Sequence, residues 1–330
     1  ITPEQRKKFV ILQILVIVMS IFEVVGIASI APFMALVADT VILEGDNILA
    51  SIYQYSGLNS KQDFVFFVGV VVLILLTLGS IISMYTIWLL TLFGQRTGVS
   101  IGNRLFELYI HKNWIYHSEN NSATLTKQIS SEANRVCNGI ILPFMLFNSK
   151  IISALFISFM LLIYDPFVAL FALFIYISMY WGLFKIIRAI LVINGKKVSQ
   201  SSEARFKLIS EGFGGIKDIL ILRSQDMFVE KFIKSGEMLA KYHGRTLALG
   251  HIPRYFMEVV AFGSVIIFLL FLLKTHENSV SAVLPIISIY ALAGLKLLPA
   301  FQQSYASIVM MQGSMPAFDA IKDDLDDCKM

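Results

Sequence analysis

The chain has 330 residues, of which 56% are hydrophobic and only 15% are charged, and its formal net charge is +4. Soluble globular proteins contain about 45–50% apolar and about 25% charged residues, so this composition excludes an ordinary water-soluble domain and indicates an integral membrane protein. The two cysteines, Cys137 and Cys328, lie far apart and do not have the spacing of a disulfide framework.

Six apolar segments follow one another along the chain, and each meets or approaches the length of about 20 residues that a helix needs to cross a bilayer. They cover residues 9–38, 64–93, 136–164, 167–184, 252–273 and 280–315. The first segment is too long to be the apolar region of a secretory signal. The sequence therefore predicts an all-α, polytopic membrane protein with six transmembrane helices.

The connections between these segments alternate between short and long. On one side, about 25 residues join the first two segments, Asp165 and Pro166 join the next two, and KTHENS joins the last two. On the other side, residues 95–135 and 185–251 form connections of 41 and 67 residues. These two connections and the chain ends hold 22 of the 27 Lys and Arg residues. By the positive-inside rule, both termini are predicted to be cytoplasmic.

The first short connection carries Ile48, Leu49, Ile52 and Tyr53 at helical spacing beside polar residues, within residues 41–60. This pattern is typical of an amphipathic helix that lies in the membrane interface. A packed extracellular cap over the first two spans is the alternative.

The two long connections carry apolar residues at helical spacing, for example Leu105, Leu108 and Tyr109. We therefore expect the spanning helices to continue beyond the membrane as arms. The expected helices cover about residues 6–38, 62–110, 123–164, 166–213, 227–273 and 280–318. Short turns are expected at the arm tips, near residues 114–121 and 222–228. Before the second tip, Gly212, Gly214 and Gly215 weaken the helix, and DILILRSQDMF can form a short cross-helix; a flexible loop is the alternative there.

Five ionisable residues fall within the predicted spans: Glu23, Lys150, Arg254, Glu258 and Lys296. A charge at mid-bilayer costs at least about 2.5–3.5 kcal/mol and normally faces a partner or a cavity. Counted along each helix, all five lie in one layer in the inner half of the bilayer. Arg254 and Glu258 are four residues apart, so they lie on one helix face and can pair.

Two explanations of these charges stay open. Interhelical ion pairs could hold the first, third, fifth and sixth spans together, and Arg254 could instead extend to the head groups at the interface. Alternatively, Lys296, which lies close to Gly294 and Pro299, faces a central cavity. A cation in such a cavity suits a phosphate group, which gains charge-assisted hydrogen bonds in a partly dry site.

Two stretches carry a resemblance to a known family. Residues 211–232, EGFGGIKDILILRSQDMFVEKF, look like the second coupling helix of ABC exporter transmembrane domains, and residues 107–136 are similar to their first coupling region. Within that family, FEVVGIASIAPFMAL, IPRYFMEVVAFG and ISIYALAGLKLLPAFQQ resemble the bacterial lipid-linked oligosaccharide flippases and related polysaccharide exporters. The resemblance covers essentially the whole chain and implies a homodimer around a central cavity in the bacterial inner membrane.

The resemblance also implies a nucleotide-binding domain that is fused or separate. The chain contains no GxxxxGK[ST] phosphate loop, so ATP and Mg²⁺ are expected on that domain and this segment is expected to hold no catalytic or metal site. Residues 1–320 would form the transmembrane domain, and residues 321–330 would begin the linker. The residues expected to contact the nucleotide-binding domain are Trp114, Tyr116, Leu222, Gln225 and Phe228.

The leading hypothesis is an ATP-driven exporter or flippase that moves an amphipathic, lipid-linked anionic substrate by alternating access. Its substrate-binding residues would be Lys296, Arg254, Glu258, Glu23 and Lys150, and its other partners would be membrane lipids rather than nucleic acid. One alternative is an exporter of peptides or drugs. Another is a membrane-embedded transferase that acts on a lipid phosphate with Glu23 or Glu258 as its base.

Overall fold

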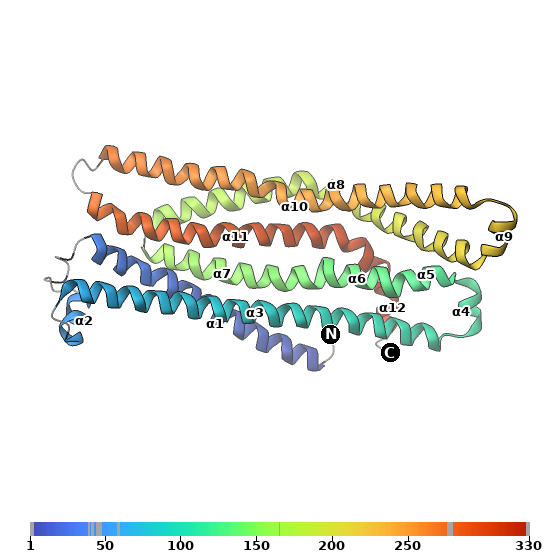
Figure 1. Ribbon diagram of the computed structural model, residues 1–330, viewed down its shortest axis with the longest axis horizontal. Coiled ribbons are helices and arrows are strands. Elements are labelled where there is room, and N and C mark those ends of the chain that lie inside the picture. The colour runs from blue at the N-terminus through green and yellow to red at the C-terminus, as the bar shows by residue number, and fades with distance from the viewer. Residues whose placement is uncertain are drawn as a thin grey trace.

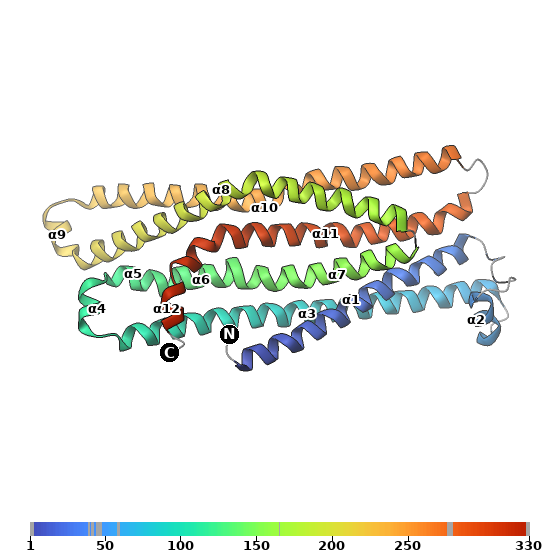
Figure 2. The ribbon, with the colours of Figure 1, turned by 180° about the vertical axis from the view of Figure 1, so that it is seen from behind.

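The structure is a computed structural model that describes residues 3–38, 40, 43, 48–57, 60–164, 166–275 and 280–327. Every regular element in these residues is a helix, which confirms the predicted all-α fold. The longest helices lie side by side as rods, as Figures 1 and 2 show from opposite sides.

Seven helices form the body of the rods and the cap at one end. They are α1 (Pro3–Ala38), α2 (Ile48–Ser56), α3 (Lys61–His111), α7 (Leu142–Tyr164), α8 (Pro166–Gly214), α10 (Gln225–Thr275) and α11 (Val280–Asp319). Short helices complete the arms: α4 (Trp114–Glu119), α5 (Ser122–Lys127), α6 (Ala133–Val136), α9 (Ile216–Ile221) and α12 (Lys322–Asp327). Two π-helical turns, η2 (Gln128–Glu132) and η3 (Cys137–Ile141), interrupt the third rod, which the sequence predicts as one continuous helix.

Within the described residues, four stretches are long and apolar enough to cross a membrane, and they make the chain a multi-pass membrane protein. These stretches are Glu4–Val37, Lys61–His111, Ser122–Ile163 and Ile177–Gly214. The other two predicted spans, 252–273 and 280–315, fall within α10 and α11, and many of their side chains lie outside what the structure describes. Large apolar side chains on α3, such as Phe66, Leu73 and Trp88, are exposed, as lipid-facing residues are.

The rods are longer than a bilayer is thick. The 51 residues of α3 extend over about 75 Å at about 1.5 Å per residue, whereas the hydrocarbon core measures about 30 Å. Both α4 and α9 lie at one end of the rods, and α2 lies at the other end (Figure 1). The helix α4 joins the arm of α3 to that of α5, and α9 joins α8 to α10.

The helix α2 packs one face on the ends of α1 and α3. Leu49 and Tyr53 contact the cluster of Leu36 and Phe64, and the rings of Tyr53 and Phe64 meet edge to face at 5.2 Å. Tyr55 on the opposite face is exposed. Of the two alternatives for the first connection, this packing favours the cap over the first two spans. Residues 41, 42, 44–47, 58 and 59 of this connection lie outside the described residues.

A buried ion network joins three rods in the tip half of the molecule. Glu132, at the end of η2, is fully buried, and its carboxylate lies 3.4 Å from Lys127 Nζ and 3.1 Å from Arg135 Nη1. Ser199 of α8 donates a hydrogen bond of 2.9 Å to the same carboxylate. Lys127 also pairs with the exposed Glu203 of α8 at 3.1 Å.

The same network reaches α11 where two glycines meet. Arg135 Nη2 donates to the backbone carbonyl oxygens of Gly195 and Gly313, each at 3.5 Å. A Cβ atom at Gly195 would overlap the carbonyl oxygen of Gly313. Glycine is therefore required at residue 195 for α8 and α11 to approach this closely.

Candidate functional site

A cavity of about 240 Å³ lies between α8, α10 and α11. Its lining comes from Tyr180 on α8, from Gly250, His251, Pro253 and Arg254 on α10, and from Pro299, Gln302, Gln303, Tyr305 and Ala306 on α11. A proline inside a helix removes one backbone hydrogen bond and bends the helix. One proline from each of two neighbouring helices borders the cavity, which explains why the helices do not close there.

Two hydrogen-bond donors of the lining are buried without a protein acceptor. The Tyr305 side chain is 4% exposed, and its ring packs with Leu191 and Val309 and lies 5.3 Å from the ring of Tyr180. Among the described residues, neither the Tyr305 hydroxyl nor Gln302 Nε2 has a hydrogen-bond partner. Each such buried group costs about 1–3 kcal/mol, so water or a ligand with acceptor atoms is expected beside them.

Arg254 brings positive charge to this cavity. Its Nε donates a hydrogen bond of 2.8 Å to Glu258 Oε1, and this contact confirms the predicted pairing of these residues. The guanidinium is more than half exposed, and the bond to Glu258 uses only one of its several N–H donors. The remaining donors can bind an anion at the mouth of the cavity.

The other predicted site residues are placed differently. Glu23 on α1 accepts a hydrogen bond of 3.2 Å from Ser83 on α3, Lys150 on α7 is half-buried, and Lys296 on α11 is exposed. In the part of the chain that the structure describes, none of these three forms an ion pair, so interhelical ion pairs among the predicted site residues are not found there. Neutral hydrogen bonds such as Ser20 to Ser153, at 3.1 Å, join the helices instead.

Lys296 extends the polar lining along α11. Residues three and seven positions apart lie on the same face of a helix. Lys296 therefore lies on the same face of α11 as Pro299 and Gln303, which border the cavity. Spacing alone could have indicated this stripe. Tyr180 and Tyr305 could not be singled out from the sequence, because an aromatic residue in a membrane helix is more often a packing residue.

The first tip presents aromatic and apolar side chains on α4. Asn113 caps the helix by accepting a hydrogen bond of 3.1 Å from the Tyr116 backbone N–H. Trp114 is 82% exposed and Ile115 is also exposed. Tyr116 is half-buried, because its ring stacks on that of Tyr109 with centroids 6.2 Å apart.

The second tip lies earlier in the chain than predicted. The short helix is α9, Ile216–Ile221, which begins after Gly215 and ends in a turn in which Arg223 has a φ of 49°. Its exposed apolar residues include Leu220 and Ile221, which the sequence analysis did not select, and Leu222, which it did. Gln225 and Phe228 belong instead to the first turn of α10.

The comparisons with known proteins agree with this architecture. A family model described as the ABC transporter transmembrane region matches residues 9–293. One similar solved structure is titled "Structure of a bacterial Atm1-family ABC exporter with ATP bound"; it is 8% identical to this chain, with a TM-score of 0.69. The alignment covers 96% of this chain and 53% of that one, so this chain spans about half the length of that exporter. At this identity the likeness shows the fold alone.

Proposed function

The chain belongs to the ABC transporter transmembrane region family, and we propose that it is the membrane domain of an ATP-driven exporter that moves an amphipathic, lipid-linked anionic substrate by alternating access. The observation that carries the choice of substrate is the cavity between α8, α10 and α11, whose lining includes the donors of Tyr305 and Gln302 and also Arg254. Phosphate oxygens are acceptors that match this set of donors.

The chemistry of the lining favours an anion over a neutral acceptor. A phosphate or diphosphate offers several oxygens to a hydroxyl, an amide and a guanidinium at once, and such charge-assisted bonds are stronger than neutral ones. Lys296, on the same face of α11, adds a second cation. Glu258 lowers the net positive charge, but its carboxylate is already held by Arg254.

The position of the cavity along the helices suits a lipid head group. Gln302 lies about 33 Å along α11 from Val280, at about 1.5 Å per residue, and the hydrocarbon core is about 30 Å thick. The cavity would therefore lie at the level of the lipid phosphates on the side that faces the tips. The positive charges of the long connections support a cytoplasmic location for that side, and we place the chain in a bacterial inner membrane.

The tips supply the proposed link to ATP. Exposed apolar residues such as Trp114 on α4 and Leu222 at the end of α9 would dock into nucleotide-binding domains, which would hold ATP and Mg²⁺. Tyr116, Gln225 and Phe228 would support these contacts. A second copy of the chain would complete a central cavity, with the long helices acting as levers between the tips and the membrane.

ATP hydrolysis by the transporter assembled with its nucleotide-binding domains, fused or separate, in lipid nanodiscs tests the proposed substrate. A polyprenyl diphosphate sugar lipid should stimulate hydrolysis, and Tyr305→Phe should raise the half-maximal lipid concentration about 10-fold or more. A hydrogen bond to a charged group contributes about 1.5–3 kcal/mol, and each 1.4 kcal/mol is about tenfold in affinity. Gln302→Glu should weaken the response further, because it places a carboxylate beside the phosphate.

Tyr85→Phe is the matched control, because Tyr85 lies exposed on α3, away from the cavity. This variant should respond to the lipid as the unaltered protein does. Stimulation by peptides or hydrophobic drugs but not by the diphosphate lipid would contradict the proposed substrate. Chemical conversion of the lipid without ATP would instead favour a transferase.

A further inference from the structure

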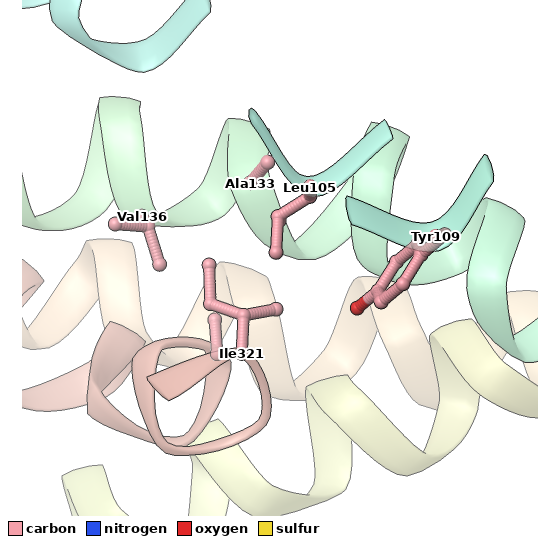
Figure 3. Close-up of a cluster of buried hydrophobic side chains, with 6 residues drawn as sticks. Leu105, Tyr109, Ala133, Val136 and Ile321 are labelled. Atoms are coloured by element: carbon pink, nitrogen blue, oxygen red, sulfur yellow. The ribbon is translucent and has the colours of Figure 1, made fainter. Parts of the chain in front are cut away.

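After α11 the chain turns sideways and lays α12 across the arm of α3 (Figures 1 and 2). Ile321, in the turn that precedes α12, is fully buried against Leu105 and Tyr109 of α3 and against Ala133 and Val136 of α6. Figure 3 shows these side chains converging on Ile321. The turn between α11 and α12 is therefore part of a hydrophobic core that it shares with the arms of α3 and α6.

Polar contacts extend this docking onto the acidic face of α12. The Tyr109 hydroxyl donates a hydrogen bond of 2.6 Å to Asp324 Oδ2. Gln128 Nε2 donates to the Ala320 carbonyl oxygen at 3.2 Å. Lys112 Nζ lies 3.1 Å from Asp327 Oδ2. Two of the carboxylates of α12, those of Asp324 and Asp327, thus each have a donor from the end of α3.

The residues that hold α12 also hold the first tip. Tyr109 stacks on Tyr116 of α4, and the ammonium group of Lys112 lies 5.6 Å from the centre of the Tyr116 ring. Desolvation, and then the nearby charge of Asp324, raise the pKa of Tyr116. The helices α4 and α12 therefore contact the same two side chains, Tyr109 and Lys112.

The second tip is held differently. In α9, only Ile219 is buried, and Phe228 of α10 lies close to Gly212 of α8, where a Cβ atom would be 3.7 Å from the Phe228 ring. These contacts come from the two arms that α9 itself joins. The first tip is instead linked to a segment more than 200 residues away in sequence.

We infer that α12 is a strap that fastens the end of α11 to the first tip, so that α4 and the tip-side end of α11 move as one body. Tyr109, Lys112, Asp324 and Asp327 are the positioning residues of this strap. The mechanical effect of the strap rests on the proposed function: force that a nucleotide-binding domain applies to α4 would pass directly to α11, which lines the cavity. The fastening itself requires neither ATP nor substrate.

Hydrogen exchange of the purified protein, followed by mass spectrometry, tests the fastening. In the double variant Lys112→Met and Asp324→Asn, backbone amides of residues 114–119 and 322–327 should exchange at least about five-fold faster, while those of residues 216–221 should not change. Tyr109→Phe, which keeps the ring and removes only the hydroxyl, should give a smaller change in the same two segments. If the double variant does not fold, Tyr109→Phe alone still tests the fastening.

The control removes an exposed ion pair on α8, Lys207 with Glu211 at 3.7 Å. Lys207→Met should leave exchange at residues 114–119 unchanged. Faster exchange in α12 with unchanged exchange in α4, in both strap variants, would overturn the inference. So would equal acceleration at residues 216–221, because the effect would then not be specific to the first tip.

Transport measurements separate this inference from the proposed function. In the reconstituted transporter, Asp324→Asn should lower the substrate moved per ATP several-fold without changing the lipid concentration for half-maximal stimulation. Tyr305→Phe should change that concentration. If the unaltered protein does not respond to the lipid, the proposed substrate is wrong while the exchange result still decides whether the strap exists. An unchanged ratio of transport to hydrolysis in Asp324→Asn would contradict the strap's coupling role.

Discussion

The buried carboxylate of Glu132 provides a sharp test of how the arms are held together. It has no exposed surface and contacts two cations, Lys127 at 3.4 Å and Arg135 at 3.1 Å. Removing one member of a buried ion pair costs about 3–5 kcal/mol, because the remaining charge is left without compensation. Lys127 keeps Glu203 as a partner, so we expect the lower end of that range for Glu132→Gln.

The matched control is Glu203→Gln, which removes the other carboxylate that contacts Lys127. Glu203 is 56% exposed on its side chain, and exposed ion pairs contribute only about 0–1 kcal/mol. Thermal unfolding of the purified protein in detergent should show a loss of about 5 °C or more for Glu132→Gln and little change for Glu203→Gln.

A double variant completes this test. If the unpaired cation causes the loss, Lys127→Met combined with Glu132→Gln should cost less than the sum of the two single changes. Equal melting temperatures for the Glu132 and Glu203 variants, or strict additivity in the double variant, would refute the reasoning.

Two further predictions follow from the packing and the tips. Gly195→Ala should destabilise the protein by about 2 kcal/mol or more, because its methyl group would overlap the Gly313 carbonyl oxygen. Gly182→Ala, where a Cβ atom meets nothing within 4 Å, should be neutral or stabilising by up to about 1 kcal/mol; thermal unfolding compares the two, and equal losses would contradict the close contact. Leu220→Asp should lower substrate-stimulated ATP hydrolysis several-fold by removing an apolar contact of the second tip. Val229→Asp, also exposed but on α10, should not lower it, and equal losses would argue against α9 as the docking helix.

The course of the long helices could be predicted from the sequence because two strong signals coincide. Apolar runs of the length that a bilayer requires mark the rods, and the distribution of Lys and Arg separates the long connections from the short ones. The fold is confirmed, including a short helix at each tip. The shift of the second tip is explained by Gly214 and Gly215, which end α8 rather than merely weakening it.

Features that depend on distant partners could not be predicted. The sequence KDDLDD is typical of a solvated linker, and α12 docks only because Tyr109 and Lys112 lie near it in the folded chain. The π-helical turn that ends at Glu132 leaves no periodic signal, since it changes one turn of an otherwise regular helix. Spacing predicted the pairing of Arg254 with Glu258, but it did not indicate that the donors of Gln302 and Tyr305 are buried without a partner among the described residues.

Movement of a diphosphate lipid across proteoliposomes tests the central claim most directly. We predict that the transporter assembled with its nucleotide-binding domains moves a fluorescent polyprenyl diphosphate sugar lipid between leaflets only when ATP and Mg²⁺ are present on the side of the tips. Tyr305→Phe should slow this movement at low lipid concentration, and Tyr85→Phe should not. Movement that does not require ATP, or no movement of this lipid while another class of substrate is exported, would contradict the account.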